Sequence, residues 1–439
     1  MAKPKRNTLE AGIVERRALV SVIGLGYVGL PLALTYIKAG FNVLGLEVDK
    51  QKLALLSRGE SGIVDVENEE LAKCLEKDEL RITDDFSRLS ESDIMAICVP
   101  TPLDKTKSPD VSYLLDATKQ IKKYLQRGQL VILESTTYPG TTQELICPIL
   151  EETGLTVGDD FFLAYSPERV DPGNRKFSIA NTPKVLGGIT DRCLYYAKLF
   201  YEQVVDSVIP VSSAKSAEMV KLLENTFRSV NIALVNEVAL MCNVLGIDVW
   251  EVIDAAATKP FGYMRFYPGP GLGGHCIPID PHYLSWKLKS LNYYARFIEL
   301  AGEINSNMPR FVMGKVMKGL NEDGKSVKGS GVLVLGVAYK ANINDVRESP
   351  ALDIIRLLQE SGADVLYHDP FVPSLMLDGE EFNSTPLTGE LLQKLDCLVI
   401  TTDHSDLDYG WIASHSKLIV DSRNATKNLG QTKARIVRL

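Results

Sequence analysis

Apolar and polar positions alternate in blocks over the first half of the chain, from Leu19 to about Pro210. Short runs there are rich in β-branched and aromatic residues and are hydrophobic at nearly every position, as strands buried on both faces are. Helical stretches separate these runs, which is the pattern of a mostly parallel sheet covered by helices. The pattern predicts a doubly wound domain over residues 1–210, with strands at ALVSVIG, FNVLGLE, DIMAICV, QLVILES, FFLAYS, KVLGG and DSVIPV.

A helical pattern follows between Pro210 and Gly246. These 35 residues contain neither glycine nor proline, and their apolar positions recur at helical spacing. They predict one long helix, which at about 1.5 Å per residue spans on the order of 50 Å. We expect this helix to bridge the flanking domains and to offer a face to a second subunit in a homodimer. A further helical stretch from Tyr294 to Leu320, interrupted by Pro309, completes a small middle domain over residues 211–320.

The alternation of strands and helices resumes after the polar linker NEDGKSVKGSG. Strands are predicted at GVLVLGVAY, ADVLYHD, CLVITTD and KLIVDSR, and helices from Pro350 to Glu360 and near Glu390. This is a second Rossmann-like unit over residues 321–439. The predicted fold class is therefore α/β, with two Rossmann-like doubly wound domains joined by a long central helix and a small helical middle domain.

Composition narrows the class of protein. The chain has 439 residues, which at roughly 150 residues per domain fits two or three domains, and three are expected. It is 45% hydrophobic and 24% charged with a formal net charge of −8, so no chain-wide basic field exists to hold nucleic acid or an anionic membrane. Its seven cysteines are scattered and never in CxxC spacing, which argues against a disulfide framework and a zinc site. A reducing cytoplasm fits best.

Neither a signal peptide nor a membrane span is predicted near the N-terminus. MAKPKRNTLEAGIVERRA is basic and lacks an apolar core, so it is interpreted as a polar lead-in. The uncharged run from Leu19 to Ile37 has the length of a transmembrane segment, with 19 residues. Because it contains three motif glycines and Pro31, a buried strand followed by a helix is predicted instead.

The glycines of GLGYVG lie between the first predicted strand and the helix that follows it. In that context GxGxxG is the fingerprint of a dinucleotide site, because the backbone approaches the pyrophosphate there. Glu47 ends the second strand 23 residues after Gly24, where a carboxylate would accept hydrogen bonds from the adenosine ribose. An acid there favours NAD over NADP because it repels a 2′-phosphate, and Asp49 is the less favoured alternative. The predicted NAD contacts in this region are Gly24, Gly26, Tyr27, Val28, Gly29 and Glu47.

Two later strand ends are expected to line the same crevice, since ligands in open α/β sheets collect beyond the carboxyl ends of strands. CVPTP and ESTT both place small hydroxyl residues and backbone amides where a nicotinamide ribose and a bound water could sit. Each segment on its own is also compatible with an ordinary strand-end turn. The predicted cofactor contacts are Val99, Pro100, Thr101, Ser135 and Thr136.

A single thiol, Cys276, lies in the glycine- and proline-rich stretch YPGPGLGGHCIPIDPHY. Glycines there cost backbone entropy, which is worthwhile only where a ligand or backbone comes close. The other six cysteines are interpreted as core residues. His275 is the neighbour of Cys276 and its side chain is expected to diverge, so Asp280 is the better charged partner or proton acceptor. A dinucleotide that accepts hydride and a thiol together could take an alcohol to an acid.

Lys221 and Asn225 are four residues apart on the long predicted helix and therefore share a face. A cation and an amide that converge on one point suit an alkoxide, a thiohemiacetal oxyanion or a thioester carbonyl. From the sequence alone, a solvated lysine with a polar neighbour is the commoner alternative. Glu168 in SPERVDPGN follows a strand end, where a surface carboxylate is likewise commoner.

The order of motifs along the chain resembles the UDP-glucose/GDP-mannose dehydrogenase family, NAD-dependent enzymes that oxidise C6 of nucleotide sugars. The resemblance covers nearly the whole chain from about Leu19. The motifs are GxGYVG, CVPTP, ESTTxPGTT, SPE, AExxKxxxNxF, PGPGxGGHCIPxDP, GxAYKxxxxDxRES and DSRN.

The resemblance implies a role for each matching residue. Cys276 matches the thiol nucleophile, Glu168 the carboxylate that activates water, and Thr136 the hydroxyl that orders that water. Lys221 and Asn225 match the pair that stabilises the oxyanion, and Asp280 the aspartate beside the thiol. Pro172 stands where some members carry a second glutamate, so no role is assigned there. The implied contacts with the UDP-sugar are Glu168, Lys221, Asn225, Tyr267, Gly274, Tyr339, Lys340 and Arg423, whereas Arg347 is expected to reach the dinucleotide.

The family chemistry implies two oxidations at one site, through a thiohemiacetal and then a thioester on Cys276. HCIPIDP most resembles the branch that acts on UDP-N-acetylglucosamine for bacterial surface polysaccharides, because UDP-glucose enzymes tend to carry lysine at the position of Ile279. UDP-N-acetylgalactosamine, UDP-N-acetylmannosamine and UDP-glucose are the alternative substrates. Arg265 could contact a sugar or a neighbouring subunit.

Two hypotheses of other classes remain open from the sequence. The chain could be a regulator that binds nucleotide sugars without reaction, but the intact set of Cys276, Glu168, Lys221 and Asn225 argues against this. It could also be a simple two-electron dehydrogenase of the 6-phosphogluconate type, which needs neither the thiol nor the second α/β domain.

Overall fold

The computed structural model describes residues 6–63, 66–104, 108–169, 174, 176–274 and 277–439. The chain forms two compact units. Unit 1 comprises Met1–Glu224 and His282–Tyr293, and unit 2 comprises Asn225–Pro281 and Tyr294–Leu439. The division into domains 1–210, 211–320 and 321–439 stays a prediction.

Within the described residues, unit 1 is built on an eight-stranded sheet of order β3-β2-β1-β4-β5-β6-β7-β8. All neighbours are parallel except β6 and β7, as predicted for a mostly parallel sheet. Each of the seven predicted strands forms, and β3 is the strand that the hydrophobic pattern did not predict. The strands are β1 (Leu19–Ile23), β2 (Asn42–Leu46), β3 (Leu80–Thr83), β4 (Ile94–Ile97), β5 (Leu130–Leu133), β6 (Phe162–Tyr165), β7 (Lys184–Gly188) and β8 (Val208–Pro210).

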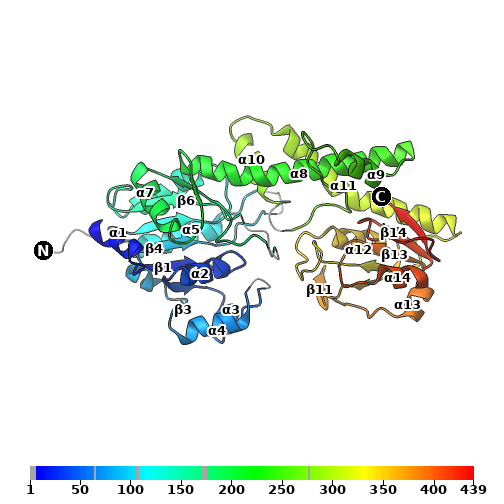
Figure 1. Ribbon diagram of the computed structural model, residues 1–439, viewed down its shortest axis with the longest axis horizontal. Coiled ribbons are helices and arrows are strands. Elements are labelled where there is room, and N and C mark those ends of the chain that lie inside the picture. The colour runs from blue at the N-terminus through cyan, green and yellow to red at the C-terminus, as the bar shows by residue number, and fades with distance from the viewer. Residues whose placement is uncertain (1–5, 64–65, 105–107, 170–173, 175, 275–276) are drawn as a thin grey trace. The chain divides into compact units, whose positions relative to one another are not determined.

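Helices cover both faces of this sheet (Figure 1). One core joins the strands to α1, α2, α4 and α7, and the other joins them to α5, α6 and the first turn of α8. The strands feed both cores because successive side chains point to opposite faces: Ile94 packs in the first and Met95 in the second. The helices are α1 (Arg6–Val14), α2 (Gly29–Lys38), α3 (Lys50–Leu56), α4 (Asn68–Glu76), η1 (Phe86–Glu91), α5 (Ser112–Tyr124), η2 (Thr142–Ile146), α6 (Cys147–Glu151) and α7 (Asp191–Tyr201).

The N-terminal region differs from the predicted polar lead-in. Residues Arg6–Val14 form α1, and its Leu9 and Ile13 are buried in the core of unit 1. The uncharged run after it forms β1 and α2, as predicted. In the part of the chain that the structure describes, no helix is both long and apolar enough to cross a membrane.

The predicted long helix is α8 (Ala214–Leu245), whose residues belong partly to unit 1 and partly to unit 2. The second predicted helix, α11 (Arg296–Glu322), is not interrupted at Pro309 but continues through it. Two shorter helices, α9 (Val249–Ala256) and α10 (Asp280–Lys289), lie between α8 and α11 in the chain.

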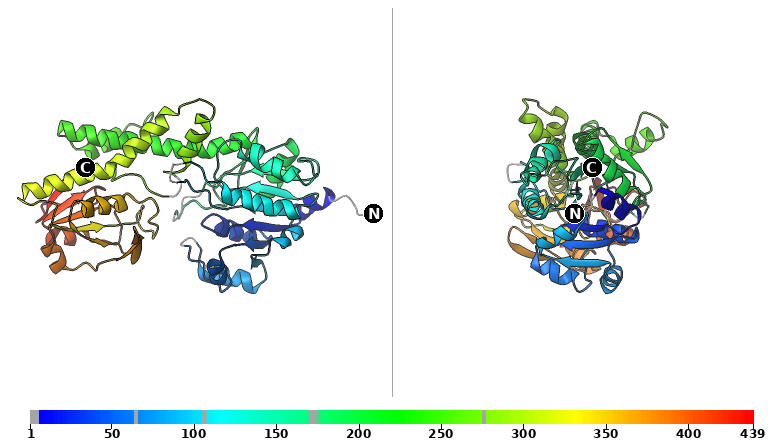
Figure 2. Two further views of the ribbon diagram at one scale, coloured as in Figure 1. Left: turned by 180° about the vertical axis from the view of Figure 1, so that it is seen from behind. Right: turned by 90° about the vertical axis from the view of Figure 1, so that its left-hand side faces the viewer.

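Unit 2 contains a parallel sheet of order β10-β9-β13-β14-β15. Its strands are among the yellow to red arrows in the left-hand view of Figure 2. Val332 and Val334 pack toward α11 and α12, and Leu333 and Leu335 pack toward α13 and α14, so both faces are buried. The pattern did not predict β15 or the hairpin of β11 and β12. The elements are β9 (Gly331–Leu335), α12 (Pro350–Glu360), β10 (Asp364–His368), β11 (Ser374–Leu377), β12 (Glu380–Asn383), α13 (Gly389–Lys394), β13 (Cys397–Ile400), α14 (Tyr409–His415), β14 (Leu418–Asp421) and β15 (Arg435–Arg438).

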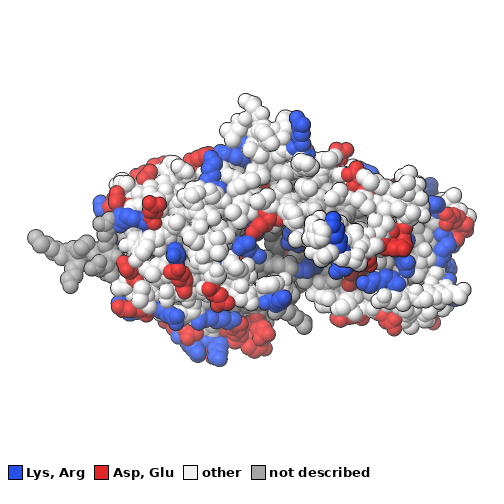
Figure 3. All heavy atoms as spheres, turned by 45° about the horizontal axis from the view of Figure 1, so that its top comes forward, with Lys and Arg blue, Asp and Glu red and all other residues white. Residues whose placement is uncertain are grey.

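Charges of both signs are mixed on the face drawn in Figure 3. Lysines and arginines there alternate with acidic residues and form no broad field of one sign. This distribution agrees with the small net charge of −8.

Candidate active site

The turn between β1 and α2 requires glycine at two positions. Gly24 has a φ of +92°, and a Cβ there would lie 2.8 Å from the carbonyl oxygen of Cys98. A Cβ on Gly29 would lie 1.8 Å from the carbonyl oxygen of Gly24. The strand, the turn and the helix can therefore approach this closely only without side chains.

The middle of the same turn is open. At Gly26 the nearest heavy atom to an added Cβ is Nζ of Lys52, at 3.9 Å, and Tyr27 is 42% exposed. Val28 precedes the first turn of α2 and gives no side-chain cap to its amides. Uncapped amides at a helix N-terminus beside an accessible glycine backbone fit the pyrophosphate of a dinucleotide.

Glu47 follows β2 at the same edge of the sheet and is 7% exposed. Its Oε2 accepts a hydrogen bond from the amide of Leu25 at 3.3 Å and pairs with Nζ of Lys52 at 2.8 Å. Asp49, the alternative acid, is the N-cap of α3 and accepts from the amides of Gln51 and Lys52. Sequence reasoning missed Lys52, whose signal is its place on the first turn of α3, five residues after Glu47.

The two later strand ends lie next to each other, because β4 and β5 are paired. The hydroxyl of Ser135 donates to the carbonyl of Val99 at 2.8 Å, which joins the two segments. The Tyr283 hydroxyl of α10 donates to the carbonyl of Thr101 at 2.8 Å. Thr136 is half-buried and Pro100 is exposed. The structure thus brings these predicted cofactor contacts of unit 1 to one edge of the sheet.

Glu168 follows β6 and contacts a buried lysine that sequence reasoning missed. Nζ of Lys184 donates to Oε2 of Glu168 at 3.3 Å and to Oε2 of Glu134 at 2.7 Å. Lys184 is the first residue of β7, and its side chain is 4% exposed. A charged residue at the start of a buried strand is the signal that could have identified it.

Burial and charge act on this group in opposite directions. Burial raises the pKa of Glu134 to about 7, although the Lys184 ammonium and the Tyr201 hydroxyl favour its carboxylate. Burial disfavours the ammonium of Lys184, but Glu134 and Glu168 outweigh this and raise the Lys184 pKa. The lysine is therefore a permanent cation between two carboxyl groups.

Within unit 1, two charged residues on the first part of α8 bond to segments that follow strands β5 and β6. Nζ of Lys221 donates to the main-chain carbonyl of Glu168 at 2.5 Å. Glu218, fully buried, accepts from the amide and the hydroxyl of Thr142 at 2.9 and 2.6 Å, and from the amide of Gly140 at 2.5 Å. Burial raises the pKa of Glu218 even so. Sequence reasoning assigned no role to Glu218, although its motif AExxK contains it.

In unit 2, Nδ2 of Asn225 donates to Oδ2 of Asp280 at 2.5 Å. Asp280 begins α10 and is 2% exposed, and Asn225 is 7% exposed. The structure therefore brings together two of the predicted catalytic residues. Cys276, the predicted nucleophile, and His275 lie outside the described residues.

The glycine loop before Cys276 rests on a series of buried amides. The amide of Gly269 donates to Oδ1 of Asn236 at 2.9 Å, and Nδ2 of Asn236 donates to Oδ1 of Asn305 at 2.9 Å. Nδ2 of Asn305 in turn donates to the carbonyl of Ser229 at 3.2 Å. Further along the loop, Gly274 has a φ of +95°, and a Cβ there would lie 3.0 Å from the Tyr339 ring. The loop is thus packed without side chains against a predicted UDP contact.

Two further predicted contacts of unit 2, Arg423 and Tyr267, are hydrogen-bonded to acids. Nε of Arg423 donates to Oδ1 of Asp403 at 3.0 Å, and its Nη1 would lie 2.8 Å from a Cβ on Gly269. The Tyr267 hydroxyl donates to Oδ1 of Asp254 at 2.5 Å, with the Arg265 guanidinium 5.2 Å from its ring. These hydrogen bonds orient the side chains of Arg423 and Tyr267.

Arg347 and Lys340 lie in the segment that follows β9. The guanidinium of exposed Arg347 donates to both oxygens of Asp345, and its carbonyl accepts from the amide of Gly274 at 3.1 Å. Lys340 is half-buried and follows Tyr339. Arg347 therefore also holds the glycine loop through its backbone, which sequence reasoning did not foresee.

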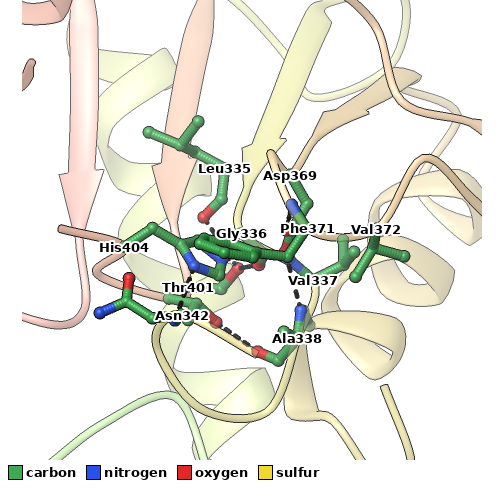
Figure 4. Close-up of polar contacts among 12 residues, drawn as sticks. Leu335, Gly336, Val337, Ala338, Asn342, Asp369, Phe371, Val372, Thr401 and His404 are labelled. Carbon is green, nitrogen blue, oxygen red and sulfur yellow. Dashed lines mark hydrogen bonds and ion pairs between the residues drawn. The ribbon is translucent and has the colours of Figure 1, made fainter. Parts of the chain in front are cut away.

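A buried acid and histidine pair, shown in Figure 4, is hydrogen-bonded to the segment that follows β9. Oδ2 of Asp369 accepts from Nε2 of His404 at 3.0 Å and from the amides of Val337 and Ala338 at 2.7 and 3.0 Å. Nδ1 of His404 accepts from the amide of Asn342 at 3.0 Å. Because an amide can only donate, the ring carries its proton on Nε2. Burial opposes ionisation of Asp369, but His404 and the amides hold its pKa below the usual value.

Three models of one protein family match successive parts of the chain. The NAD-binding domain of the UDP-glucose/GDP-mannose dehydrogenase family matches residues 18–205. The central domain of that family matches residues 215–307, and its UDP-binding domain matches residues 333–428.

Individual proteins of this family are similar to the chain over most of their length. A UDP-N-acetyl-D-mannosamine dehydrogenase of Pyrococcus horikoshii is 35% identical over 93% of this chain and 96% of its own. A UDP-N-acetyl-D-glucosamine 6-dehydrogenase of Pseudomonas aeruginosa is 36% identical over 88% of this chain and 90% of its own. A solved structure of a UDP-D-ManNAc dehydrogenase from P. horikoshii superposes with a TM-score of 0.86 at 33% identity, covering 96% of this chain and 98% of that one.

These matches confirm the resemblance stated from the motifs. They also agree with a fold of two nucleotide-binding domains and a central helical region. The chain therefore belongs to the UDP-glucose/GDP-mannose dehydrogenase family, as an NAD-dependent UDP-sugar dehydrogenase.

Proposed function

We propose that the chain oxidises the C6 alcohol of a UDP-N-acetylhexosamine to a carboxylate, with UDP-N-acetylglucosamine as the first candidate substrate. The observation that carries this proposal is the pairing of the predicted catalytic residues. In unit 1, Lys221 contacts the backbone of Glu168, and in unit 2, Asn225 contacts Asp280. Side chains that pair in this way are held in place before substrate arrives, which catalysis requires.

The residues at the β1–α2 turn fit NAD. The open Gly26, the uncapped start of α2 and the acid at Glu47 would hold its pyrophosphate and adenosine ribose. Val99, Thr101, Ser135 and Thr136 would lie along its nicotinamide half, with Arg347 as a further contact. When bound, NAD supplies the hydride acceptor for each of the two oxidations.

Cys276 is the proposed nucleophile. The C6 alcohol first loses its hydroxyl proton and gives a hydride to NAD, which leaves an aldehyde. The thiolate adds to this aldehyde to form a thiohemiacetal, and loss of the hydroxyl proton and of a second hydride to a second NAD leaves a thioester. Lys221 and Asn225 stabilise the oxyanion at each stage, because an ammonium and an amide both donate hydrogen bonds. Asp280 is the proposed acceptor of the thiol proton.

Glu168 is the proposed base of the hydrolytic step. Its carboxylate takes a proton from a water that Thr136 orders, and the water oxygen attacks the thioester carbonyl. The C–S bond then breaks, which releases the acid and returns the thiolate of Cys276.

The UDP part is assigned to unit 2, where Tyr267, Gly274, Tyr339, Lys340 and Arg423 are its proposed contacts. The choice of N-acetylhexosamine follows from relatives named for N-acetylglucosamine and for N-acetylmannosamine. Identities of 35% and 36% are too similar to separate the two sugars, so UDP-N-acetylmannosamine is the second candidate. UDP-N-acetylgalactosamine and UDP-glucose follow.

We further propose a homodimer that forms through the central helix. The α8 residues of unit 2 include Phe227, Leu234, Met241 and Val244, which are 45%, 54%, 50% and 84% exposed. Large apolar side chains at this exposure favour a partner surface, and a second copy would match them with the same residues. The scattered cysteines favour a reaction in the reducing cytoplasm. We propose surface polysaccharide synthesis as the use of the product.

The yield of NADH from limiting sugar tests the proposed reaction. With purified protein and excess NAD, about two NADH per UDP-N-acetylglucosamine are expected, since each oxidation yields one. About one NADH would mean that the reaction stops at the aldehyde and that Cys276 is not the nucleophile. If this sugar gives none while UDP-N-acetylmannosamine gives two, the chemistry stands and the substrate changes. No NADH from any of the four sugars would favour a binding protein without catalysis.

A further inference from the structure

Three charged side chains form a row of ion pairs that leads inward from Glu168 in unit 1. Lys184 lies between Glu168 and Glu134, at 3.3 and 2.7 Å from their Oε2 atoms. The exposed fractions of the three side chains are 13% for Glu168, 4% for Lys184 and 0% for Glu134. Glu168 is thus the end of this row of ion pairs that reaches solvent.

Two tyrosines lie at the inner end of this row of ion pairs. The Tyr201 hydroxyl donates to Oε1 of Glu134, and the hydroxyls of Tyr201 and Tyr36 are 2.9 Å apart. Burying this lysine and its two carboxylates costs desolvation energy that well-packed apolar residues would avoid. Stability alone therefore gives a weak reason for the arrangement, whereas control of Glu168 gives a specific one.

The carboxylate of Glu168 is fixed from both of its oxygens. Oε1 accepts from the amide of Arg169 at 2.7 Å, and Oε2 faces the Lys184 ammonium. Arg169 is anchored in turn, because its guanidinium donates to Oε1 of Glu224 at 2.6 Å and to the carbonyl of Pro183 at 2.6 Å. Arg169 therefore links the segment after β6 to the residue before Lys184 and to α8.

We propose that Lys184 and Glu134 are positioning residues for the hydrolytic step, in which Lys184 keeps Glu168 as a correctly oriented carboxylate and Glu134 holds Lys184 in place. This inference rests on the proposed role of Glu168 as the base. A base must be deprotonated before it can take a proton from water, and a cation at hydrogen-bonding distance favours the deprotonated form. The proton of the attacking water goes to Glu168, and the thiolate of Cys276 leaves, so Lys184 exchanges no proton.

Lys184 is a cation that pairs directly with the Glu168 carboxylate. Lys221 contacts the main-chain carbonyl of Glu168, and Arg169 is paired with Glu224. Glu134 opposes Lys184 with a negative charge once it is ionised. Among the described residues, the titratable or charged groups near these three side chains are Tyr36 on α2, Cys98 after β4, Arg169 after β6, Tyr201 on α7, and Lys221 and Glu224 on α8.

The test is the pH dependence of thioester hydrolysis in single turnovers, followed by intact-protein mass and by NADH. Lys184→Met removes the charge and keeps the length. We expect hydrolysis to slow about tenfold near pH 6 and its acidic limb to move up by about one pH unit, because Glu168 then loses its proton less readily. The covalent adduct should accumulate, while the rate of the NADH burst that precedes hydrolysis is unchanged. Lys184→Arg retains the charge and should restore most of the rate.

Glu134→Gln separates control of charge from damage to structure. It removes a carboxyl group that opposes Lys184 only when ionised, and it leaves the ammonium, so its acidic limb should stay in place or move down. A purely structural role would move the limbs of both variants in the same direction. Lys198→Met, a surface lysine on α7 with a 45% exposed side chain, is the matched control and should behave like the unchanged protein.

A single buried charge without its partner can prevent folding. The double variant Glu134→Gln, Lys184→Met removes both charges, and it should fold and show the raised acidic limb. A folded Lys184→Met or double variant with the limb unmoved would overturn the inference. Glu168→Gln distinguishes that failure from failure of the proposed function: if this variant stalls at the adduct, the base role stands, and if it hydrolyses normally, the base role itself is wrong.

Discussion

Glu47 and Asp369 occupy equivalent positions in the two units. Each follows the second strand of its βαβ segment and accepts a hydrogen bond from the amide that comes after a strand-ending glycine, at 3.3 Å for Glu47 and 2.7 Å for Asp369. Those glycines, Gly24 and Gly336, have φ values of +92° and +84°. In unit 2, however, the histidine ring of His404 fills the place beside the acid. The same backbone arrangement thus positions a predicted ribose contact in unit 1 and a buried acid–histidine pair in unit 2.

Glu47→Gln is expected to weaken NAD binding. The amide keeps the shape of the side chain but loses the charge, so it is a weaker acceptor for ribose hydroxyls. KM for NAD should rise roughly tenfold with kcat largely retained, which corresponds to about 1.4 kcal/mol. Steady-state kinetics with NAD and NADP measure both the loss and the relaxed discrimination. Glu91→Gln, at an exposed carboxylate of η1, is the control, and an unchanged KM in Glu47→Gln would remove this assignment.

Asp369→Asn should loosen the loop after β9 and change how the stability of the folded protein depends on pH. The folded protein lowers the pKa of Asp369, so its ionisation contributes stability that is fully present above about pH 4 and is lost as pH falls. The variant loses this contribution, which we estimate at about 1–3 kcal/mol for a buried hydrogen-bonded acid. Hydrogen exchange at the amides of Val337 and Ala338 reports it locally. Equal exchange in both proteins at pH 6 would contradict the prediction.

Cys276→Ala should abolish acid formation, because no thioester can form. Cys276→Ser should stop at an ester that hydrolyses slowly, since an alkoxide leaves less readily than a thiolate. Intact-protein mass and NADH yield distinguish the two outcomes. Cys74→Ala, which changes a buried thiol on α4, should retain about two NADH per sugar. Full turnover in Cys276→Ala would rule out covalent catalysis at this residue.

Asn225→Ala should lower kcat by roughly 10²–10³ with little change in KM for the sugar, as loss of one oxyanion donor does. The change also removes the hydrogen bond to the buried carboxylate of Asp280. Asn231→Ala on the same helix removes a bond only to the carbonyl of Phe227, so it controls for helix propensity. The prediction fails if both variants lose the same activity.

Much of the fold could be predicted because each strand buried on both faces leaves a continuous apolar run. The short strand β15 reads RIVR, with charges at both ends and half-buried side chains, so its pattern is weak. Pro309 was expected to interrupt a helix, yet α11 continues through it. The pattern could not show this, because a proline can be tolerated within a helix when the surrounding packing compensates for its missing amide.

The candidate site was predictable as a set of motifs but not as a set of contacts. Lys184 reaches Glu134 across 50 residues of sequence, from β7 to the end of β5. No local spacing reveals such a pair, since it depends on which strands the sheet brings close. Glu218 was missed for the same reason, because its partner Thr142 lies 76 residues away in the sequence. Lys52, in contrast, lies five residues after Glu47, so its signal was local.

The amide series beneath the glycine loop has a direction. Asn236 accepts from Gly269 and donates to Asn305, and Asn305 passes a donor on to Ser229. An aspartate at either asparagine would offer an acceptor where a donor is needed, and a leucine would leave the next amide unmet. The two asparagines can therefore be exchanged only together. In a redesign of this protein for a different sugar, Asn236 and Asn305 should therefore be kept as a pair while the residues of the glycine loop are varied.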